Sequence, residues 1–592
     1  MDRKEIELEK SASRGVFSRL LGYAKPYILW MAAALFLVLV ITVLELYRPV
    51  IMGEVIDLFM EDAPFSEVRR CGLIYLGVLL LGFVCNFLQT WVLQMTGQNI
   101  IYNIREEVFD HINRLSLRFF DITPVGKIVT RATNDVEALH EMYANILVRL
   151  IKNTATIIGL AVVMLMLNVK IALFAFALLP FIVGLTVLFK RISRMTYRIT
   201  RTKITALNTY LSEHLSGMKV IQIFAREKEK NAEFGRKNKD LYRANYREMM
   251  VFAVFRPSIY FLSIVALSII IWTGSSSVIK GAITVGTLYT FIQYINSFFQ
   301  PIQELAEQFG TLQSAMASAE KIFTLLDEKP MIENPPHPVD PGQVRGRIVF
   351  DHVWFAYQGE EWILKDVSFT VEAGSRVAFV GATGAGKSSI LNLIGRYYDI
   401  QKGKITIDGI DIREIDKDKL RAAIGQVQQD VFIFTGDISS NIRLRREDIT
   451  DEDIVRAAKY VNADDFISHL PGGYHEPVTE RGSTLSAGQR QLLSFARTLA
   501  YNPVILVMDE ATANIDTETE LLIQEALEKL MQGRTTIMVA HRLSTIQHAD
   551  KIIVMHKGEV RESGTHQELL AADGIYKKLY ELQLHTEKNI SP

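Results

Sequence analysis

Cysteine is scarce in this sequence, and neither sign of charge dominates it. Cys71 and Cys85 are the only cysteines among 592 residues, which excludes a fold that disulfides hold together. Lysine and arginine number 65 against 66 aspartates and glutamates, giving a net charge of −1 at pH 7. This balance lacks the basic excess of a nucleic-acid-binding protein, so we expect no nucleic acid among the partners. Residues 1–10 are charged and have no apolar core, so we expect no signal peptide there.

Long stretches without Asp, Glu, Lys or Arg occur six times in the first half of the chain. Each approaches the roughly 20 residues that a membrane-spanning helix needs. Only Lys170 separates the third stretch from the fourth, and only Lys280 the fifth from the sixth, which predicts tight turns at a membrane face. Buried helices of a soluble protein are the alternative, but so many runs in one half disfavour it. The stretches are Tyr27–Leu44, Cys71–Ile104, Asn153–Val169, Ile171–Phe189, Pro257–Ile279 and Gly281–Gln303.

Charge beside these stretches predicts how they cross the membrane. Residues 4–25, 105–131 and 190–203 carry clusters of Lys and Arg, whereas residues 54–67 carry five acidic residues. Basic loops stay on the cytoplasmic side. We therefore expect a multi-pass protein of the inner, cytoplasmic membrane of the cell, with both termini in the cytoplasm.

Three further segments are predicted to be helices outside the membrane core. Residues 105–145 and 190–250 are polar and nearly free of Pro and Gly, which predicts helices that extend well into the cytoplasm. Residues 13–26 have the pattern of an amphipathic helix that lies on the inner face of the membrane.

Residues 328–346 include five prolines, as a linker between domains does. The sequence beyond them alternates short β-type runs with helical patterns, which predicts an α/β domain.

A glycine-rich loop follows one of these β-type runs. Gly381–Ser388 reads Gly-Ala-Thr-Gly-Ala-Gly-Lys-Ser and fits the phosphate-binding pattern G-x-x-x-x-G-K-[ST]. A strand over 376–380 and a helix over 389–397 flank this phosphate loop in our prediction, so backbone N–H groups would wrap phosphate oxygens at a helix N-terminus. Lys387 would neutralise the β- and γ-phosphates, and Ser388 would ligate Mg²⁺. The predicted ATP-binding residues here are Gly381, Thr383, Gly384, Ala385, Gly386, Lys387, Ser388 and Ser389.

Two adjacent carboxylates end another apolar run. Residues 504–508 form a predicted buried strand, which Asp509 and Glu510 follow directly. Asp509 would hold Mg²⁺ through water, and Glu510 would polarise the attacking water as general base. Solvated acids at a strand end are common, so the pattern gains its weight only from the phosphate loop.

The segment Leu485–Gln489, Leu-Ser-Ala-Gly-Gln, lies between these two motifs and resembles the signature of ABC transporters. The resemblance covers nearly the whole chain and matches exporters in which six membrane helices precede one nucleotide-binding domain, the layout of multidrug and lipid exporters. It implies a polytopic α-helical membrane domain joined to an α/β P-loop ATPase domain. The implied divisions are an N-terminal amphipathic region (1–26), a transmembrane domain (27–327), a linker (328–346), a nucleotide-binding domain (347–584) and a tail (585–592).

The resemblance also assigns roles to residues outside the phosphate loop. Taken alone, Tyr357 reads as a strand aromatic and His541 as a histidine at a strand end; only the ordered set carries the assignment. Ser486, Ala487, Gly488 and Gln489 would act on the ATP site of a partner subunit. The other implied roles are adenine stacking for Tyr357, Mg²⁺ contact for Gln429, a dimer-interface contact for Asp516, γ-phosphate contact for His541, and contact with the partner's intracellular loops for Glu480 in Thr479–Gly482.

Two cytoplasmic stretches resemble the intracellular loops of such exporters. They are Phe119–Gly126 with the sequence through Asp135, and Glu213–Ile221 with the sequence through Glu227. The resemblance implies that short helices at their tips dock into the nucleotide domains. That contact would convert ATP-driven closure into rearrangement of the membrane domain.

One signature position departs from the pattern of the family. Ala487 stands where glycine is usual, whereas the phosphate loop, Asp509, Glu510 and His541 are intact. A complete catalytic set with an altered signature suits one half of a heterodimeric exporter, whose partner would supply the intact signature. A homodimer that tolerates one extra methyl group is the alternative.

The cargo is less clearly specified than the reaction. Ionisable residues near membrane depth are Glu45, Arg48, Arg149, Lys152, Arg256, Glu304 and Glu307, which either contact cargo or extend to water from helix ends. Aromatic residues of the last two stretches either line an adaptable drug site or pack against helices and lipid; they are Phe261, Tyr289, Phe291, Tyr294, Phe298 and Phe299.

We expect export of hydrophobic or amphipathic small molecules, with a lipid or peptide exporter and an ATP-gated channel as alternatives. The expected partners are a second half-transporter, membrane lipid and the cargo.

Overall fold

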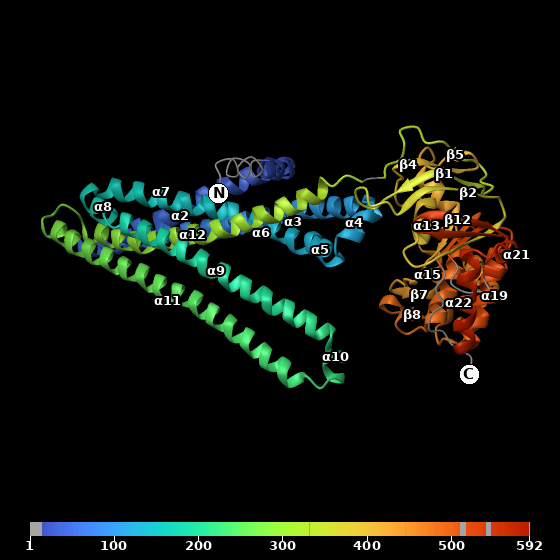
Figure 1. The fold of residues 1–592 in the computed structure, drawn as a ribbon. Coiled ribbons are helices and arrows are strands. Elements are labelled where there is room, and N and C mark those ends of the chain that lie inside the picture. The colour runs from blue at the N-terminus through green and yellow to red at the C-terminus, as the bar shows by residue number, and fades with distance from the viewer. Residues whose placement is uncertain (1–14, 331, 445, 510–516, 540–545, 591–592) are drawn as a thin grey trace. The chain divides into compact units, whose positions relative to one another are not determined.

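This computed structural model describes residues 15–590 except 331, 445, 510–516 and 540–545. Side chains at 303, 306, 309, 480, 517, 518 and 583–590 also lie outside the description. The chain divides into two compact units (Figure 1). The helical unit comprises Met1–Arg114 and Thr123–Lys329, and the nucleotide unit comprises Leu115–Ile122 and Pro330–Pro592.

The helical unit is built from long helices that short turns connect (Figure 1). Residues 15–24 are helical and continue through a 3₁₀ turn, Lys25–Tyr27, into the first long helix. Two turns are π-helical, η2 (Arg131–Asp135) and η3 (Met142–Ile146). The α-helices of this unit are α2 (Ile28–Met60), α3 (Phe65–Arg114), α5 (Val125–Thr130), α6 (Val136–Glu141), α7 (Leu147–Leu167), α8 (Val169–Phe176), α9 (Leu179–Ser216), α10 (Met218–Ile223), α11 (Glu227–Ile279) and α12 (Val285–Leu326).

Five helical stretches of the described chain are long and apolar enough to cross a membrane. These are Gly15–Met60, Phe65–Arg114, Val125–Leu167, Val169–Ser216 and Glu227–Ile279. The sixth expected span, 281–303, falls in α12 and is not among them, because polar residues such as Gln293, Asn296 and Gln300 interrupt its apolar sequence. The sixth stretch has no charged side chain but is less apolar than the other five, so its membrane crossing stays a prediction.

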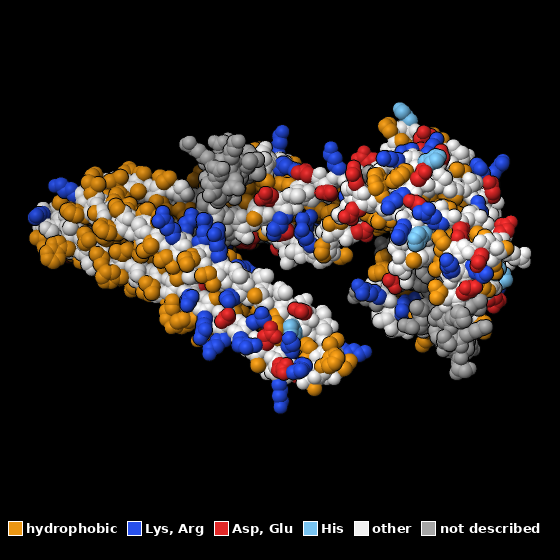
Figure 2. Space-filling model, in the orientation of Figure 1, with side chains coloured by type: hydrophobic (Ala, Val, Ile, Leu, Met, Phe, Trp, Pro, Cys, Tyr) orange, Lys and Arg blue, Asp and Glu red, His pale blue; other side chains and the backbone are white. Residues whose placement is uncertain are grey.

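Apolar and basic side chains lie on different parts of the surface of the helical unit. Figure 2 shows hydrophobic side chains covering most of the visible face around α8, with Lys and Arg gathered further along α9 and α11 towards α10. On α11, the apolar side chains of Trp272 and Ile279 are 82% and 86% exposed. Such exposure is expected where lipid, rather than water, surrounds a helix.

The turns between the spans lie close to their predicted positions. The first is at Asn168 rather than Lys170, because the Asn168 side chain accepts hydrogen bonds from the backbone N–H groups of Lys170 and Ile171 and caps α8. The second falls between Ile279 and Val285, where Thr284 caps α12. The polar extensions predicted over 105–145 and 190–250 are largely helical. The first consists of the end of α3, the short helix α4 (Leu117–Ile122), α5, η2, α6 and η3, and the second consists of parts of α9–α11.

The nucleotide unit is an α/β domain with two main sheets. The six-stranded sheet has the order β12-β11-β3-β10-β9-β6, and the four-stranded sheet has the order β2-β1-β4-β5. Its strands are β1 (Ile348–Phe355), β2 (Leu364–Val371), β3 (Arg376–Val380), β4 (Lys402–Ile407), β5 (Ile410–Asp411), β6 (Ile424–Val427), β7 (Gly436–Asp437), β8 (Pro477–Val478), β9 (Ile505–Asp509), β10 (Thr535–Val539), β11 (Lys551–His556) and β12 (Glu559–Gly564). Its helices are α4 (Leu117–Ile122), α13 (Lys387–Ile394), α14 (Lys417–Ala422), α15 (Ile438–Arg443), α16 (Asp451–Tyr460), α17 (Asp464–His469), α18 (Ala487–Ala500), α19 (Thr517–Met531), α21 (His566–Ala571) and α22 (Ile575–Ile590).

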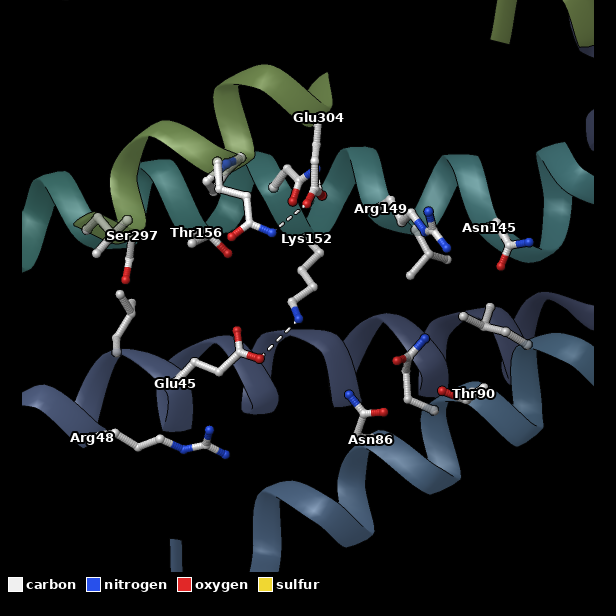
Figure 3. A pocket seen from close by; sticks show the side chains of 18 of the residues that line it. Glu45, Arg48, Asn86, Thr90, Asn145, Arg149, Lys152, Thr156, Ser297 and Glu304 are labelled. Carbon is white, nitrogen blue, oxygen red and sulfur yellow. Dashed lines mark hydrogen bonds and ion pairs between the residues drawn. The ribbon is translucent and has the colours of Figure 1, made fainter. Parts of the chain in front are cut away.

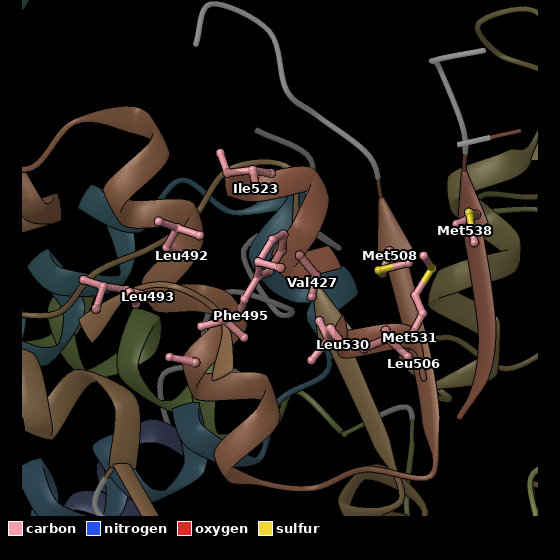
Figure 4. Packing of buried hydrophobic residues seen from close by; sticks show 14 of the residues in the cluster. Val427, Leu492, Leu493, Phe495, Leu506, Met508, Ile523, Leu530, Met531 and Met538 are labelled. Carbon is pink, nitrogen blue, oxygen red and sulfur yellow. The ribbon is translucent and has the colours of Figure 1, made fainter. Parts of the chain in front are cut away.

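Two hydrophobic cores hold this unit together. One lies between the sheets, where Phe350 stacks on Phe369 with ring centroids 4.4 Å apart. The other fixes α18 against the six-stranded sheet through Leu492 and Phe495, beside Val427 of β6 (Figure 4). Because α18 begins in the signature segment, this packing fixes the position of that segment in the domain.

Candidate functional site

The carboxyl ends of four parallel strands bring the predicted nucleotide residues to one edge of the sheet. Val539 of β10 lies opposite Phe379 of β3 on one side and Asp509 of β9 on the other. Val427, at the end of β6, lies opposite Met508 of β9. The chain therefore leaves all four strands at the same level. Ligands of parallel α/β sheets bind at this edge.

The phosphate loop leaves β3 there and turns into α13. A Cβ at Gly381 would lie 2.2 Å from the Met555 carbonyl oxygen, and one at Gly386 would lie 2.7 Å from a Leu364 methyl carbon. Gly386 also has φ of +98° and serves as the N-cap of α13. Because this left-handed cap is tight, α13 begins at Lys387 rather than at the predicted residue 389. Glycine is thus required at both positions for the loop to close.

Lys387 is buried within this loop, at 6% exposure. Its Nζ donates to the carbonyl oxygens of Gly381 and Ala382, at 2.7 and 3.1 Å. Burial lowers the pKa of Lys387, and the Asp509 carboxylate opposes that shift. A buried ammonium group beside a glycine-rich loop at a helix N-terminus is suited to bind phosphate.

The neighbouring hydroxyl groups divide between the protein interior and the open side of the site. Ser389 is buried, and its Oγ lies 3.1 Å from the hydroxyl oxygen of Tyr357. Ser388 is exposed, as is Gln429, whereas Asp509 is half-buried. In the part of the chain that the structure describes, no three or more His, Cys, Asp or Glu side chains are grouped to hold a metal ion. The side-chain oxygens of Ser388, Gln429 and Asp509 are of the kinds that ligate Mg²⁺.

The remaining loop residues of the predicted set are also placed. Thr383 and Gly384 are exposed on the open side, whereas Ala385 and Gly386 are buried beneath the loop. Tyr357 is half-buried, and its ring meets that of Tyr398 edge to face at 5.0 Å. The edge of the sheet thus holds a phosphate loop, a nearby aromatic ring and three oxygen donors.

The signature segment begins α18 through a capping box. Ser486 Oγ accepts from the backbone N–H of Gln489 at 3.2 Å, and the Gln489 side chain accepts from the backbone N–H of Ser486 at 2.9 Å. Ser486 and Ala487 are exposed, whereas Gly488 is buried. The first N–H groups of an α-helix have no partner within the helix, so this end of α18 presents donors to an anion outside it.

Several predicted residues lie where the structure makes no statement. Glu510, Asp516 and His541 fall within 510–516 and 540–545, outside the described residues, and the side chain of Glu480 is likewise not described. Their backbone neighbours are placed, however. Glu510 directly follows Asp509, and His541 follows Val539 by two residues. The described strands that precede these segments, β9 and β10, end at the edge of the sheet that carries the phosphate loop.

Comparison with known proteins decides the family. The model for the ABC transporter transmembrane region matches residues 31–302, and the model for the ABC transporter nucleotide-binding region, described simply as "ABC transporter", matches residues 364–513. The chain belongs to the ABC transporter family. The transporter is a multi-pass membrane protein that couples ATP hydrolysis to transport. The fold class and the resemblance inferred from the sequence are confirmed.

Similar proteins match most of the length of the transporter. A putative ABC transporter ATP-binding protein, exp8, from Streptococcus pneumoniae is 42% identical over 96% of this chain and 97% of its own. A probable multidrug resistance ABC transporter, YheH, from Bacillus subtilis is 41% identical over 88% of this chain and 77% of its own. An ATP-dependent lipid A-core flippase from Syntrophus aciditrophicus is 34% identical over 99% of this chain and 97% of its own.

A second candidate site lies within the helical unit of the transporter. It is a cavity of about 780 Å³ that α2, α3, α7 and α12 line together with η3 (Figure 3). Glu45 and Arg48 reach it from α2, Arg149 and Lys152 from α7, and Glu304 from α12. The cavity therefore collects five of the seven ionisable residues that the sequence suggested. Arg256 and Glu307 are exposed and do not line it.

Both carboxylates of this cavity already have partners. Lys152 Nζ reaches across from α7 to Glu45 Oε1 at 3.1 Å, as Figure 3 shows. Glu304 accepts hydrogen bonds from Asn153 at 3.1 Å and from Gln300 at 2.9 Å. These contacts tie α7 to both α2 and α12.

Most of the aromatic residues predicted in the last two spans lie outside the wall of this cavity. Phe291, Phe298 and Phe299 are buried in the packing between helices, and Phe261 is exposed on the surface of α11. Tyr294 alone of that predicted set lines the cavity, and its hydroxyl donates to the Leu46 carbonyl at 2.6 Å. The alternative of helix packing and lipid contact therefore accounts for most of these aromatic residues.

Sequence reasoning missed the uncharged polar lining. The residues concerned recur at helical spacing within the apolar stretches and were detectable as polar stripes: Asn86, Gln89, Thr90 and Gln94 on α3, Thr156 on α7, and Asn296, Ser297 and Gln300 on α12. A stripe alone does not reveal which neighbouring helix it faces, because that depends on how the helices pack.

Proposed function

We propose that the transporter exports amphipathic small molecules across the cytoplasmic membrane by alternating access. One observation carries the proposal: a buried Lys387 closes a phosphate loop at the sheet edge where Asp509 ends its strand. Transport machinery accompanies it in the same chain, since a polar cavity lies among helices long enough to span a membrane. Relatives named as multidrug and lipid A-core transporters make a lipid exporter the second candidate.

In this proposal the residues at the sheet edge divide the work of ATP hydrolysis. Tyr357 stacks on adenine, the loop N–H groups and Lys387 hold the phosphates, and Ser388, Gln429 and Asp509 provide oxygen ligands for Mg²⁺. Glu510 takes the proton of the attacking water, and His541 contacts the γ-phosphate. The ion would neutralise charge that develops between the β- and γ-phosphates.

The functional unit in this proposal is a dimer with two composite ATP sites. The signature residues Ser486–Gln489 would complete the phosphate site of the partner subunit, with Glu480 and Asp516 at the interface. The tip of the second intracellular loop supports pairing, because α10 and its flanks carry exposed apolar side chains, among them Leu215, Val220, Ile223 and Phe224. Ala487 favours a different chain as partner, whose intact signature would serve this chain's catalytic site.

The orientation follows the charge of the helix ends. The basic ends of α9 and α11 and the nucleotide domain would lie in the cytoplasm, and the acidic turn around Glu61 and Asp62 would lie outside. Loops that carry Lys and Arg resist translocation across the membrane, so this orientation places both termini inside.

Steady-state ATP hydrolysis by the full-length transporter in lipid tests the proposal. An exporter hydrolyses MgATP continuously, its cargo stimulates that rate, and a non-hydrolysable ATP analogue supports no net transport. A channel or regulator that needs only bound ATP would respond equally to the analogue. Cargo movement with the analogue, sustained over many turnovers, would therefore overturn the export proposal.

A further inference from the structure

The transporter's cavity is polar although apolar helices surround it. On α7, Arg149, Lys152 and Thr156 recur at helical spacing and face the cavity in Figure 3. The π-helical turn η3 precedes them and places Asn145 in the same wall. Polar groups at membrane depth cost free energy unless water or a ligand pairs with them. A cavity with this lining is suited to a ligand that carries a polar group of its own.

The charged side chains that line the cavity indicate the sign of the charge on the ligand's polar group. Arg48, Arg149 and Lys152 stand against two carboxylates, an excess of one positive charge. Lys152 is paired, and both carboxylates have donors. Arg48 and Arg149 have no hydrogen bond or ion pair to any residue that the structure describes. The Nε of Arg48 is buried without a partner.

We propose that this cavity binds an amphipathic anion, whose carboxylate, phosphate or sulfate group pairs with Arg48 or Arg149. Guanidinium groups bind such oxyanions through two parallel hydrogen bonds. Figure 3 shows the two arginines on either side of the Lys152–Glu45 pair, so they form two separate anion positions. Leu93, Val148 and Leu160 of the same lining provide apolar surface for the tail of the molecule. This proposal rests on the proposed export function and names its cargo class.

Direct binding to the purified full-length transporter, in a non-ionic detergent, tests the proposal. Three fluorescent probes share one twelve-carbon chain and end in a carboxylate, a methyl ester or a trimethylammonium group. We expect the carboxylate to bind at least about 10-fold more tightly than the ester, the effect of one charge-assisted hydrogen bond. Equal dissociation constants for the carboxylate and the ester would overturn the proposal.

Variants assign the preference to the two arginines. The double variant R48Q/R149Q should lose the preference for the carboxylate probe while its affinity for the ester stays within about 2-fold of wild type. The double variant R48K/R149K keeps both charges and should keep most of the preference, which separates loss of charge from loss of fold. Arg256 is exposed on α11 outside the cavity, so R256Q is the matched control and should behave as wild type. A carboxylate preference that survives in R48Q/R149Q would overturn the proposal.

A competition experiment separates the two sources of such an anion. Phosphatidylglycerol in phosphatidylcholine nanodiscs supplies an anionic lipid headgroup, and dodecyl phosphate supplies a soluble amphipathic anion. Displacement of the carboxylate probe by either competitor supports the anion site and identifies the source. Displacement by neither would overturn it.

Transport assays with the same probes keep the two proposals apart. If ATP drives movement of the ester or ammonium probe but not the carboxylate, the anion proposal fails and the export proposal stands. If the carboxylate binds preferentially and ATP moves none of the probes, the anion site stands and the export proposal fails.

Discussion

The hydroxyl of Tyr398 donates a hydrogen bond to the carboxylate of Asp121. Tyr398 is 7% exposed in the nucleotide unit, while Asp121 belongs to α4, in the segment predicted to be the first intracellular loop. Residues 115–122 are part of the same compact unit as the nucleotide-binding residues, although they follow α3 in the chain. Burial, together with the nearby Asp121 carboxylate, raises the pKa of Tyr398, so its hydroxyl remains a donor at physiological pH. The short helix α4 therefore docks on the nucleotide domain, as the family resemblance implied for this loop.

Removal of that hydrogen bond should uncouple hydrolysis from transport. Tyr398→Phe preserves the edge-to-face contacts with Phe355 and Tyr357 but removes the donor. A hydrogen bond to a charged group contributes about 1.5–3 kcal/mol, so the amount of cargo moved per ATP hydrolysed should fall. Asp121→Asn should act in the same direction, and the double variant should be little worse than either single one.

Tyr397→Phe is the matched control, since the Tyr397 hydroxyl has no hydrogen-bond partner among the residues described. Transport and hydrolysis are measured on the same reconstituted sample. A wild-type ratio in Tyr398→Phe would mean that α4 docks without carrying the coupling.

Loss of the Lys387 ammonium group should weaken nucleotide binding. Lys387→Ala removes both the positive charge and the two hydrogen bonds that close the phosphate loop. We expect the dissociation constant for ATP to rise at least about 10-fold, measured by titration with a fluorescent ATP analogue. Lys404→Ala, on an exposed strand position of the same domain, should leave it unchanged. Wild-type affinity in Lys387→Ala would contradict the assignment of the phosphate loop.

Replacement of the proposed general base should separate binding from turnover. Glu510→Gln keeps the size of the side chain but removes its basicity, so ATP should bind with unchanged affinity. Turnover should fall about 10²–10⁴-fold, the usual cost of removing a general base. The variant should accumulate as a closed dimer with ATP bound, detectable as radiolabelled ATP retained after gel filtration. A kcat above roughly a tenth of the wild-type value would exclude this role for Glu510.

The two ATP sites of the assembled transporter should be unequal. Ala487 is exposed at the first turn of α18, where alanine favours the helix but adds a methyl group to the surface that would face the partner's nucleotide. Purification of this chain alone and together with a co-expressed second half-transporter tests the inequality, with the number of ATP molecules retained per dimer as readout. A stable dimer of this chain alone, with two equivalent sites and normal cargo-stimulated hydrolysis, would establish the homodimer instead.

Local motifs were predictable from the sequence because the chemistry of each is confined to a few neighbouring residues. The strand before the phosphate loop was predicted at 376–380, the bounds that β3 has. The helix after it starts two residues earlier than predicted, since the left-handed Gly386 allows α13 to begin at once. The turn between the third and fourth spans shifts to Asn168 because its side chain caps α8, a hydrogen bond that hydropathy does not register.

The cavity was only partly predictable, because it depends on contacts between distant parts of the chain. The ionisable residues stood out in apolar surroundings, but Lys152 meets Glu45 only when α7 packs beside α2, 107 residues away in sequence. The same packing takes Phe291 and Phe298 into the helix interface and away from the cavity. Residue type therefore indicated which side chains are unusual, while helix packing decides which of them share a site.

Uphill accumulation of a fluorescent amphiphile in inside-out membrane vesicles tests the central claim most directly. Wild-type vesicles supplied with MgATP should concentrate at least one probe of the carboxylate, ester and ammonium series above its external level. Vesicles containing Glu510→Gln or Lys387→Ala should accumulate none, because each variant interrupts the hydrolytic cycle at a different step. Accumulation that is equal in all three preparations, or continuous ATP hydrolysis by wild type without uphill movement of any probe, would contradict the account.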